Sequence, residues 1–285
     1  MTRVSLILLA LAVVFGCKKS TAPEEGGGGG GGGGGGSTAS PESTAVYFGI
    51  TPDSSFVYWD STTSSSSGTA LDTVQTIFYT YITSGGELLV PHVDTFFTSG
   101  RTLKDTFHIK GDTVYQYITM VLDTTNPSPD TIRLRYIFGI KPLDIGKSWI
   151  PLSPQTQRLN DTIKYPLMAT CTLGVRLDSF KVDSSYAYIM DSLSVSVPAG
   201  TFRAYKIRGK THARVFYGLF TIPTGCLPIS GDTFATLDTY DTTYIKPYYG
   251  VVLTQAKDST VFNIPPMGSQ IETTRRYRAL TGKRR

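Results

Sequence analysis

The fold of this chain is decided by one stretch, Thr106-Phe-His-Ile-Lys110 followed by Gly111-Asp112 and then Thr113-Val-Tyr-Gln-Tyr-Ile118. Aromatic and β-branched residues dominate both arms. Apolar and polar side chains alternate along the first arm, which is the two-residue period of a β-strand. Gly-Asp between two such arms is typical of a tight hairpin turn. The stretch therefore predicts two antiparallel strands.

The rest of residues 43–285 repeats this organisation. Short alternating segments are bounded by Gly, Pro, Asp or Ser, as in residues 132–138, where Arg133 and Arg135 alternate with apolar side chains. No segment keeps the 3.6-residue period of an amphipathic helix. We therefore predict a single all-β domain over residues 43–285, built as an antiparallel curled sheet or an open β-barrel with few or no helices.

Turn residues support this prediction. Pro198 and Gly200 predict a tight turn between residues 197 and 201. Asp-Thr pairs are expected to mark strand edges, because Asp favours turns and Thr favours strands, and we expect no carboxylate cluster from them. Such pairs include those of Asp72, Asp94, Asp105, Asp112, Asp161, Asp232 and Asp241.

The N-terminus carries an export signal. Arg3 supplies a positive charge, residues 4–15 are almost all apolar, and Gly16 precedes Cys17. An apolar run of this length is too short to span a bilayer, which needs about 20 residues, so residues 1–16 are predicted to be a removable signal peptide. This segment resembles the signal peptide and lipobox of a bacterial lipoprotein. The resemblance implies lipid attachment at Cys17, and the alternative is a plain secretory signal with an incidental cysteine.

Residues 17–42 are expected to form a disordered tether behind the lipidated cysteine. Residues 26–36 are all glycine, the residue that loses most backbone entropy on ordering, and they offer no side chain to bury. A random coil of this length reaches about 25–30 Å. The tether would therefore hold the domain away from the lipid headgroups.

Three further stretches resemble a group of uncharacterised bacterial envelope lipoproteins. They are the aromatic opening at residues 47–58, the element Pro142-Leu-Asp-Ile-Gly-Lys-Ser-Trp149, and the element Val195-Ser-Val-Pro-Ala-Gly-Thr-Phe202 together with residues 245–252. They span most of the predicted domain. The resemblance implies an envelope location but no particular activity, because that group has no established one.

The positive charge of the chain is concentrated at its C-terminal end. The formal net charge is +5, and residues 275–285 hold six Lys and Arg residues, so the rest of the processed chain is slightly acidic. A basic end of this kind does not predict a nucleic-acid-binding face. We expect a last strand with a solvated end, and the alternative is contact with anionic lipid or glycan.

Few residues suggest a chemical site. Export would favour a disulfide between Cys171 and Cys226, although the sequence leaves open whether they meet. Two such cysteines and three scattered histidines predict no metal site, and we expect no cofactor. The patterns GxSxG, HExxH and CxxC are absent. His92, His108 and His212 are therefore expected to be half-buried strand residues.

These observations favour a lipid-anchored protein of the bacterial cell envelope, expected at the outer membrane. We expect a non-enzymatic binding or scaffolding domain without catalytic residues, held to the membrane by acylated Cys17, whose partner is an envelope lipid, glycan or protein. One alternative is a carrier of a lipid or other apolar ligand, and the third is an envelope glycan hydrolase with two carboxylates that meet in space. Trp59 and Trp149 are expected in the core, with carbohydrate stacking as their alternative role.

Overall fold

The computed structural model describes residues 40–121, 131–160, 162–168, 171–221, 233–264 and 268–284. The predicted signal peptide, Cys17, residues 17–39 of the tether, and Cys226 lie outside these ranges. The elements are α2 (Pro41–Tyr47), β1 (Ser55–Ser64), β2 (Gly68–Phe78), β3 (Ile82–Ser84), β4 (Glu87–Phe96), β5 (Thr102–Lys110), β6 (Thr113–Val121), β7 (Thr131–Ile140), β8 (Ser148–Trp149), β9 (Gln155–Arg158), β10 (Thr162–Met168), β11 (Cys171–Val197), β12 (Gly200–Thr221), β13 (Thr233–Lys246), β14 (Gly250–Ile264) and β15 (Gly268–Arg284).

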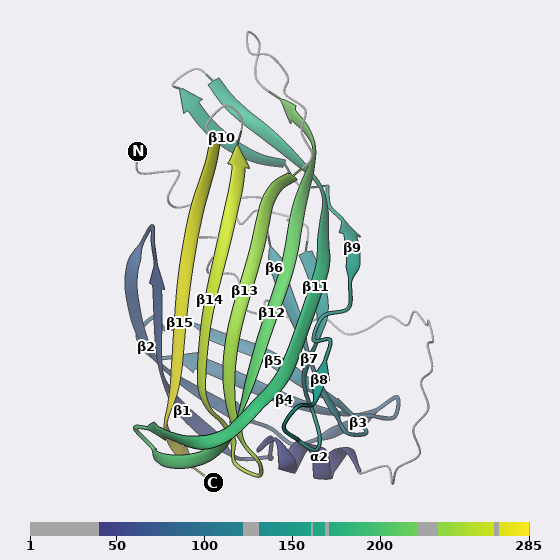
Figure 1. Cartoon of the computed structure of the whole chain (residues 1–285), viewed down its shortest axis with the longest axis vertical. Coiled ribbons are helices and arrows are strands. Elements are labelled where there is room, and N and C mark those ends of the chain that lie inside the picture. The colour runs from purple at the N-terminus through teal and green to yellow at the C-terminus, as the bar shows by residue number, and fades with distance from the viewer. Residues whose placement is uncertain are drawn as a thin grey trace.

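The predicted all-β antiparallel fold is confirmed. All these strands belong to one sheet, whose main path runs β10-β11-β12-β13-β14-β15-β1-β2-β4-β5-β6-β7 (Figure 1). Strand β3 pairs with β4, and β8 and β9 pair with β11. The C-terminal strand β15 lies between β14 and β1, so the basic end of the chain is built into the middle of the sheet.

Two of the hairpins form where the turn residues in the sequence predict them. Lys110 pairs with Thr113 in the β5–β6 hairpin, as the deciding stretch predicts. Val197 pairs with Gly200 across the predicted turn at Pro198. Gly200 has a φ of 129°, a backbone conformation that L side chains rarely adopt.

The sheet is curled but not closed, and the β8–β9 segment lies between its two edges. Trp149 in β8 pairs with Ala187 of β11. On the other side, its indole Nε1 donates a hydrogen bond of 3.2 Å to the carbonyl of Ile137 in β7. The backbone N–H of Ile137 donates to the carbonyl of Pro151 over 2.8 Å. Trp149 is 8% exposed, as expected for a core residue.

Bulges bend the long β11–β12 hairpin. The register shifts between Val182 and Ser184 and again between Ile189 and Asp191, so β11 has an extra residue at each place. An extra residue on one strand bends it and increases its local twist. Figure 1 shows the hairpin sweeping across the lower ends of β13, β14 and β15, where the N–H of Ala199 donates to the carbonyl of Leu280 over 3.1 Å.

The bent hairpin and helix α2 both cover the lower end of the sheet. Helix α2 begins after Ser40, whose hydroxyl caps the helix by accepting a hydrogen bond from the N–H of Ser43. Its last residue, Tyr47, and its C-cap, Phe48, enter one core cluster with side chains from the bent hairpin, such as Val195. A second cluster lies higher up, between β7, β11, β12, β13 and β14. Within the described residues, no helix has both the length and the apolar character needed to cross a membrane.

Candidate functional site

A cavity of about 400 Å³ lies inside the curled sheet. A smaller space of about 190 Å³ adjoins it toward α2 and shares part of its lining. The residues common to both are polar or charged apart from one phenylalanine, and they form a belt across the interior. They are His92, Asp94, Gln116, Phe138, Thr254 and Arg278.

One wall of the cavity is apolar. It is formed by alternate residues of β5, β6, β7, β11, β12 and β13, which the pleat directs inward. The side chains are Leu103, Ile118, Leu134, Tyr136, Phe138, Phe180, Val182, Ala213 and Leu237, joined by Leu152 and Phe96. Burial raises the pKa of Tyr136, so its hydroxyl stays neutral and can donate a hydrogen bond.

The facing wall, on β1, β14 and β15, is charged. The Arg278 guanidinium donates to the carboxylate of Asp60 over 2.8 Å and 3.2 Å. Two residues earlier in β15, Arg276 donates a hydrogen bond of 2.7 Å to the carboxylate of Asp258. These bonds neutralise two carboxylates and hold both guanidinium groups against the inner face.

A further carboxylate, that of Asp241 on β13, lines the cavity beside the charged wall. Asp241 pairs across the sheet with Gly209 on β12 and Ala256 on β14, two small residues. A Cβ atom at position 209 would overlap the Asp241 carboxylate, so the missing side chain makes the space that this carboxylate occupies. Burial raises the pKa of Asp241 to about 6, although Arg276 opposes the rise.

Two more carboxylates line the cavity, Asp94 in the belt and Asp105 beside it. Asp94 accepts a hydrogen bond of 2.5 Å from the hydroxyl of Thr76, and Asp105 accepts one of 2.7 Å from the Gln116 amide. Burial lowers the pKa of His92, so its ring is neutral at neutral pH. The interior therefore holds more carboxylates than guanidinium groups and favours a ligand that brings a positive charge or hydrogen-bond donors.

This arrangement corrects one expectation from the sequence. Asp94, Asp105 and Asp241 each precede a threonine and were expected only at strand edges, yet they line one cavity. The curl of the sheet brings β4, β5 and β13 to the same interior, and no local signal predicts that. The two-residue alternation of β15 could have predicted part of this arrangement, because it places Arg276 and Arg278 on one face of the strand and Arg275 on the other.

The other predicted site residues are placed as follows. Cys171 opens β11 and pairs with Met168, while Cys226 lies outside the described residues, so the disulfide stays a prediction. Trp59 is 40% exposed, so its expected place in the core is wrong. Its side chain lies edge-on against Tyr277 on the outer face, with 5.7 Å between the ring centroids. Among the residues that the structure describes, no three His, Cys, Asp or Glu residues are grouped to hold a metal ion.

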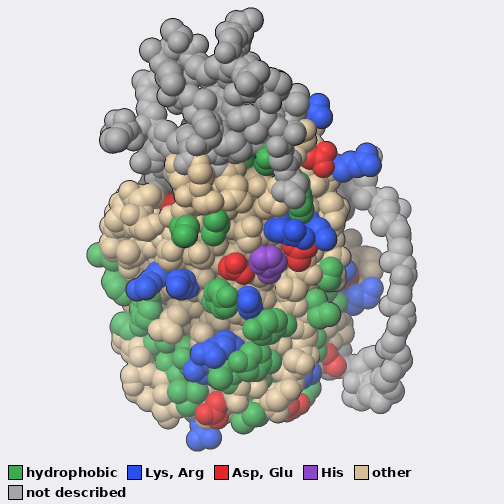
Figure 2. All heavy atoms as spheres, turned by 45° about the horizontal axis from the view of Figure 1, so that its top comes forward, with side chains coloured by type: hydrophobic (Ala, Val, Ile, Leu, Met, Phe, Trp, Pro, Cys, Tyr) green, Lys and Arg blue, Asp and Glu red, His purple; other side chains and the backbone are tan. Residues whose placement is uncertain are grey.

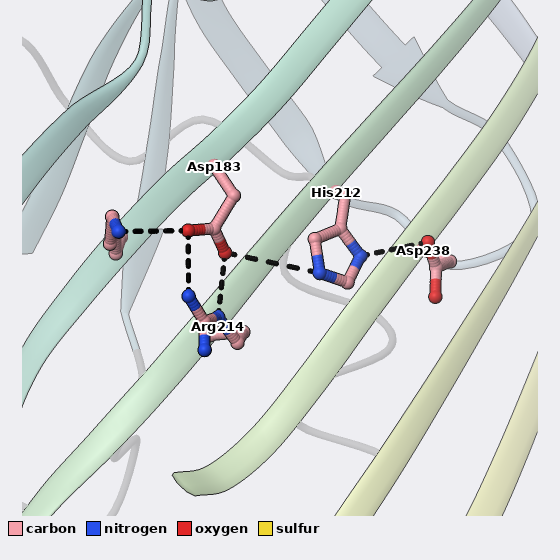
Figure 3. A network of polar contacts seen from close by, with 5 residues as sticks. Asp183, His212, Arg214 and Asp238 are labelled. Atoms are coloured by element: carbon pink, nitrogen blue, oxygen red, sulfur yellow. Dashed lines mark hydrogen bonds and ion pairs between the residues drawn. The ribbon is translucent and has the colours of Figure 1, made fainter.

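The histidines have different environments. His92 is buried, and His108 on β5 lies 3.3 Å from the Glu87 carboxylate. His212 belongs to a polar network on the outer face, drawn in Figure 3. Its Nδ1 lies 3.0 Å from Asp238, and its Nε2 lies 3.9 Å from Asp183.

The same network holds two more cations. Asp183 accepts two hydrogen bonds from Arg214, of 2.7 Å and 2.9 Å, and lies 3.0 Å from the Lys181 ammonium. The hydrogen bonds from Arg214 are the first cause of the lowered pKa of Asp183. Both ring nitrogens of His212 face carboxylates, so the network is a cross-strand ion-pair ladder without the nucleophile of a catalytic triad.

Comparisons with known proteins gave matches to solved structures alone. No family model and no curated protein matches the sequence. A candidate lipoprotein from Parabacteroides distasonis is 12% identical, with a TM-score of 0.43 over 84% of this chain and 98% of that one. A candidate exported protein with a YmcC-like fold from Bacteroides fragilis is 11% identical, with a TM-score of 0.39 over 84% of this chain and 99% of the other.

Proposed function

We propose that this protein is a lipid-anchored protein of the bacterial cell envelope, held at the outer membrane, that binds a small amphipathic molecule without changing it chemically. The observation that supports binding is the interior cavity of about 400 Å³, with an apolar wall opposite a charged one. Ligand pockets in proteins commonly measure about 300–1,000 Å³ and combine apolar walls with a few placed polar groups. The sequence around Cys17 supports the anchor.

The lining specifies the ligand further. The volume lies near the lower end of that range, which suits one small molecule better than a lipid with two long chains. The apolar part of the ligand would lie against β6 and β7. Its cationic or hydrogen-bond-donating part would face Asp94, Asp105 and Asp241.

The test is to identify what the protein carries. The protein is purified from its native membranes, denatured and extracted, and the extract is analysed by mass spectrometry beside that of Ala213→Phe. Ala213 is 4% exposed and lines the cavity, so the larger ring should occupy ligand space. We expect one small molecule in stoichiometric amount from the wild type and at least tenfold less from the variant.

Two further variants complete this test, a surface control and a second cavity-filling substitution. Ala70→Phe makes the same substitution on the exposed part of β2 and should retain the ligand. Ala256→Leu fills the cavity from another strand, in case Ala213→Phe unfolds. Identical extracts from the wild type and from folded cavity variants would contradict the proposal.

One observation favours a second candidate function, hydrolysis of an envelope glycan. Asp241 lines the cavity with a pKa raised to about 6, which suits a general acid. A hydrolase would release new reducing ends from an envelope glycan preparation, and Asp241→Asn would abolish that release. An absence of release by the wild type would remove this candidate.

A further inference from the structure

The outer face of the sheet carries a second hollow, of about 580 Å³, which we call the outer groove. It crosses strands β11, β12, β13, β14, β15 and β1. Figure 2 shows this side of the molecule, where Lys and Arg side chains lie among hydrophobic ones below a histidine. The groove opens on the opposite face of these strands from the interior cavity, and Asp241, Ala256 and Arg276 border both spaces. Its tyrosines and the cations Arg208, Lys257 and Arg275 line the groove alone.

The strand register explains how the groove is built. One row of paired residues crosses all six strands, and the residues two positions along each strand form a second row on the same face. The first row is Tyr186, Lys210, Tyr240, Lys257, Arg275 and Thr63. The second row contains Tyr188 beside Arg208, and ends with Tyr277 beside Ser61. Six strands at about 4.8 Å spacing make each row roughly 24 Å long.

Four cations line the groove, and Arg276 is the one that pairs with a carboxylate, that of Asp258, among the described residues. Within the described ranges, Arg208, Lys257 and Arg275 form no ion pair, and Lys257 stands directly opposite Arg275 in the register. Like charges directly opposite each other destabilise a sheet. Higher on the same face, the cations of the His212 network are paired with carboxylates (Figure 3). The groove therefore concentrates unneutralised positive charge.

One acidic residue also borders the groove. It is Asp241, which alternates inward with the cavity-lining residues of β13. Among the described residues it forms no ion pair with Arg208, Lys257 or Arg275, so it does not neutralise these three cations. The groove thus suits an anionic occupant.

Aromatic rings lie at both ends and in the middle of the groove. Tyr186 and Tyr188 stack with 6.2 Å between their centroids at the β11 end. Tyr277 contacts Trp59 at the β1 end, and Tyr240 lies in the middle with the Lys210 ammonium 5.1 Å from its ring centroid. Such rings offer an apolar face with a polar tip, which can pack on the apolar faces of sugar rings while the hydroxyl groups bond to sugar hydroxyls.

We propose that the outer groove binds a chain of anionic sugars, such as a polymer of uronic acids. Unpaired cations would face its carboxylates, and the tyrosines would stack on its rings along the roughly 24 Å row. A membrane surface fits less well, because membrane-binding faces insert apolar side chains, whereas this face is hollow and lined by Tyr, Thr, Gln and cations.

The test measures binding of alginate oligosaccharides to the purified protein by titration calorimetry at low and high salt. We expect binding that weakens at high salt because the contacts are ionic. Lys257→Gln and Arg275→Gln should each raise the Kd about threefold to fivefold. Tyr240→Ala should also weaken binding. Lys257→Gln should leave folding intact or slightly improved, since it removes a like-charge pair.

Matched control variants distinguish binding in the groove from a general effect of surface charge on binding. Lys104→Gln removes one charge from exposed β5, and Tyr79→Ala removes a ring that is 46% exposed, as Tyr240 is. Both should bind alginate as the wild type does. Equal weakening by Lys104→Gln, equal binding of neutral dextran, or binding to phosphatidylglycerol vesicles without binding to alginate would each overturn the proposal. The cavity test is unaffected by these outcomes.

Discussion

At the scale of single residues, the most informative side chain is Asp241. Its pKa is raised to about 6 by burial, so the folded protein holds this proton more tightly than the unfolded chain, where the pKa is near 3.8. As the pH rises from about 4 to 6, the unfolded state loses its proton first, and the free energy of unfolding falls. A rise of about two pKa units corresponds to roughly 3 kcal/mol.

Asp241→Asn should therefore stabilise the protein at neutral pH. We expect the free energy of unfolding at pH 7.5 to rise by up to about 3 kcal/mol and the gain to disappear near pH 4, as measured by denaturant titration across this range. Asp183→Asn is the contrasting variant. The pKa of Asp183 is lowered by Arg214, so its contribution is present above about pH 4 and is lost at lower pH. Gains of equal size at both pH values for Asp241→Asn would contradict this interpretation.

At the scale of elements, the docking of α2 on the sheet depends on one glycine. A Cβ atom at Gly139 in β7 would lie 2.6 Å and 2.8 Å from ring carbons of Phe48, the C-cap of α2. Phe48 is 2% exposed, so its ring is held inside the core. Gly139→Ala should therefore overpack this contact and lower the free energy of unfolding by about 1–3 kcal/mol, measured by denaturant titration.

The control for this prediction is Gly282→Ala in β15. A Cβ atom there meets nothing within 4 Å, so we expect a change within about 0.5 kcal/mol. Phe48→Leu introduced together with Gly139→Ala should recover part of the loss, because the smaller side chain leaves space for the new methyl group. Equal effects of the two glycine substitutions would show that the loss does not come from the contact with Phe48.

The elements also show what the sequence could and could not predict. The hairpins at Gly111 and Pro198 depend on residues adjacent in the chain, so their turn chemistry was sufficient. The bulge at Asp183 and the insertion of β15 beside β1 depend on pairings between distant segments, which alternation does not specify. The charged lining of the cavity was missed for that reason, as were the paired roles of Arg276 and Arg278. The exposed Trp59 was missed because alternation does not tell which face of a strand is covered.

At the scale of the whole molecule, the fold places two kinds of surface on one sheet. The inner face combines an apolar wall with a surplus of carboxylates, and the outer face of the same strands carries unpaired cations and aromatic rings. The described chain starts at Ser40, next to α2 at the lower end of the sheet (Figure 1). The segment that would connect the body to Cys17 therefore joins this end, and the outer groove lies along the side of the body.

This arrangement allows the proposed anchor at Cys17 to be removed without changing the body. Cys17→Ser removes the sulfur that would carry the lipid, while the whole described domain is unchanged. Each buried methylene contributes about 0.8 kcal/mol and a single acyl chain holds a protein only marginally, so stable attachment needs two or more chains at Cys17. We expect the wild type in the membrane fraction and Cys17→Ser in the soluble fraction after cell breakage, with mass spectrometry showing acylation of the wild type alone. Cys171→Ser, a cysteine of β11, should remain in the membrane fraction. Membrane retention of Cys17→Ser would show that the protein attaches through another part of the chain. Charge reversal at Lys257 and Arg275 would then test whether the cationic outer face of the sheet binds the membrane.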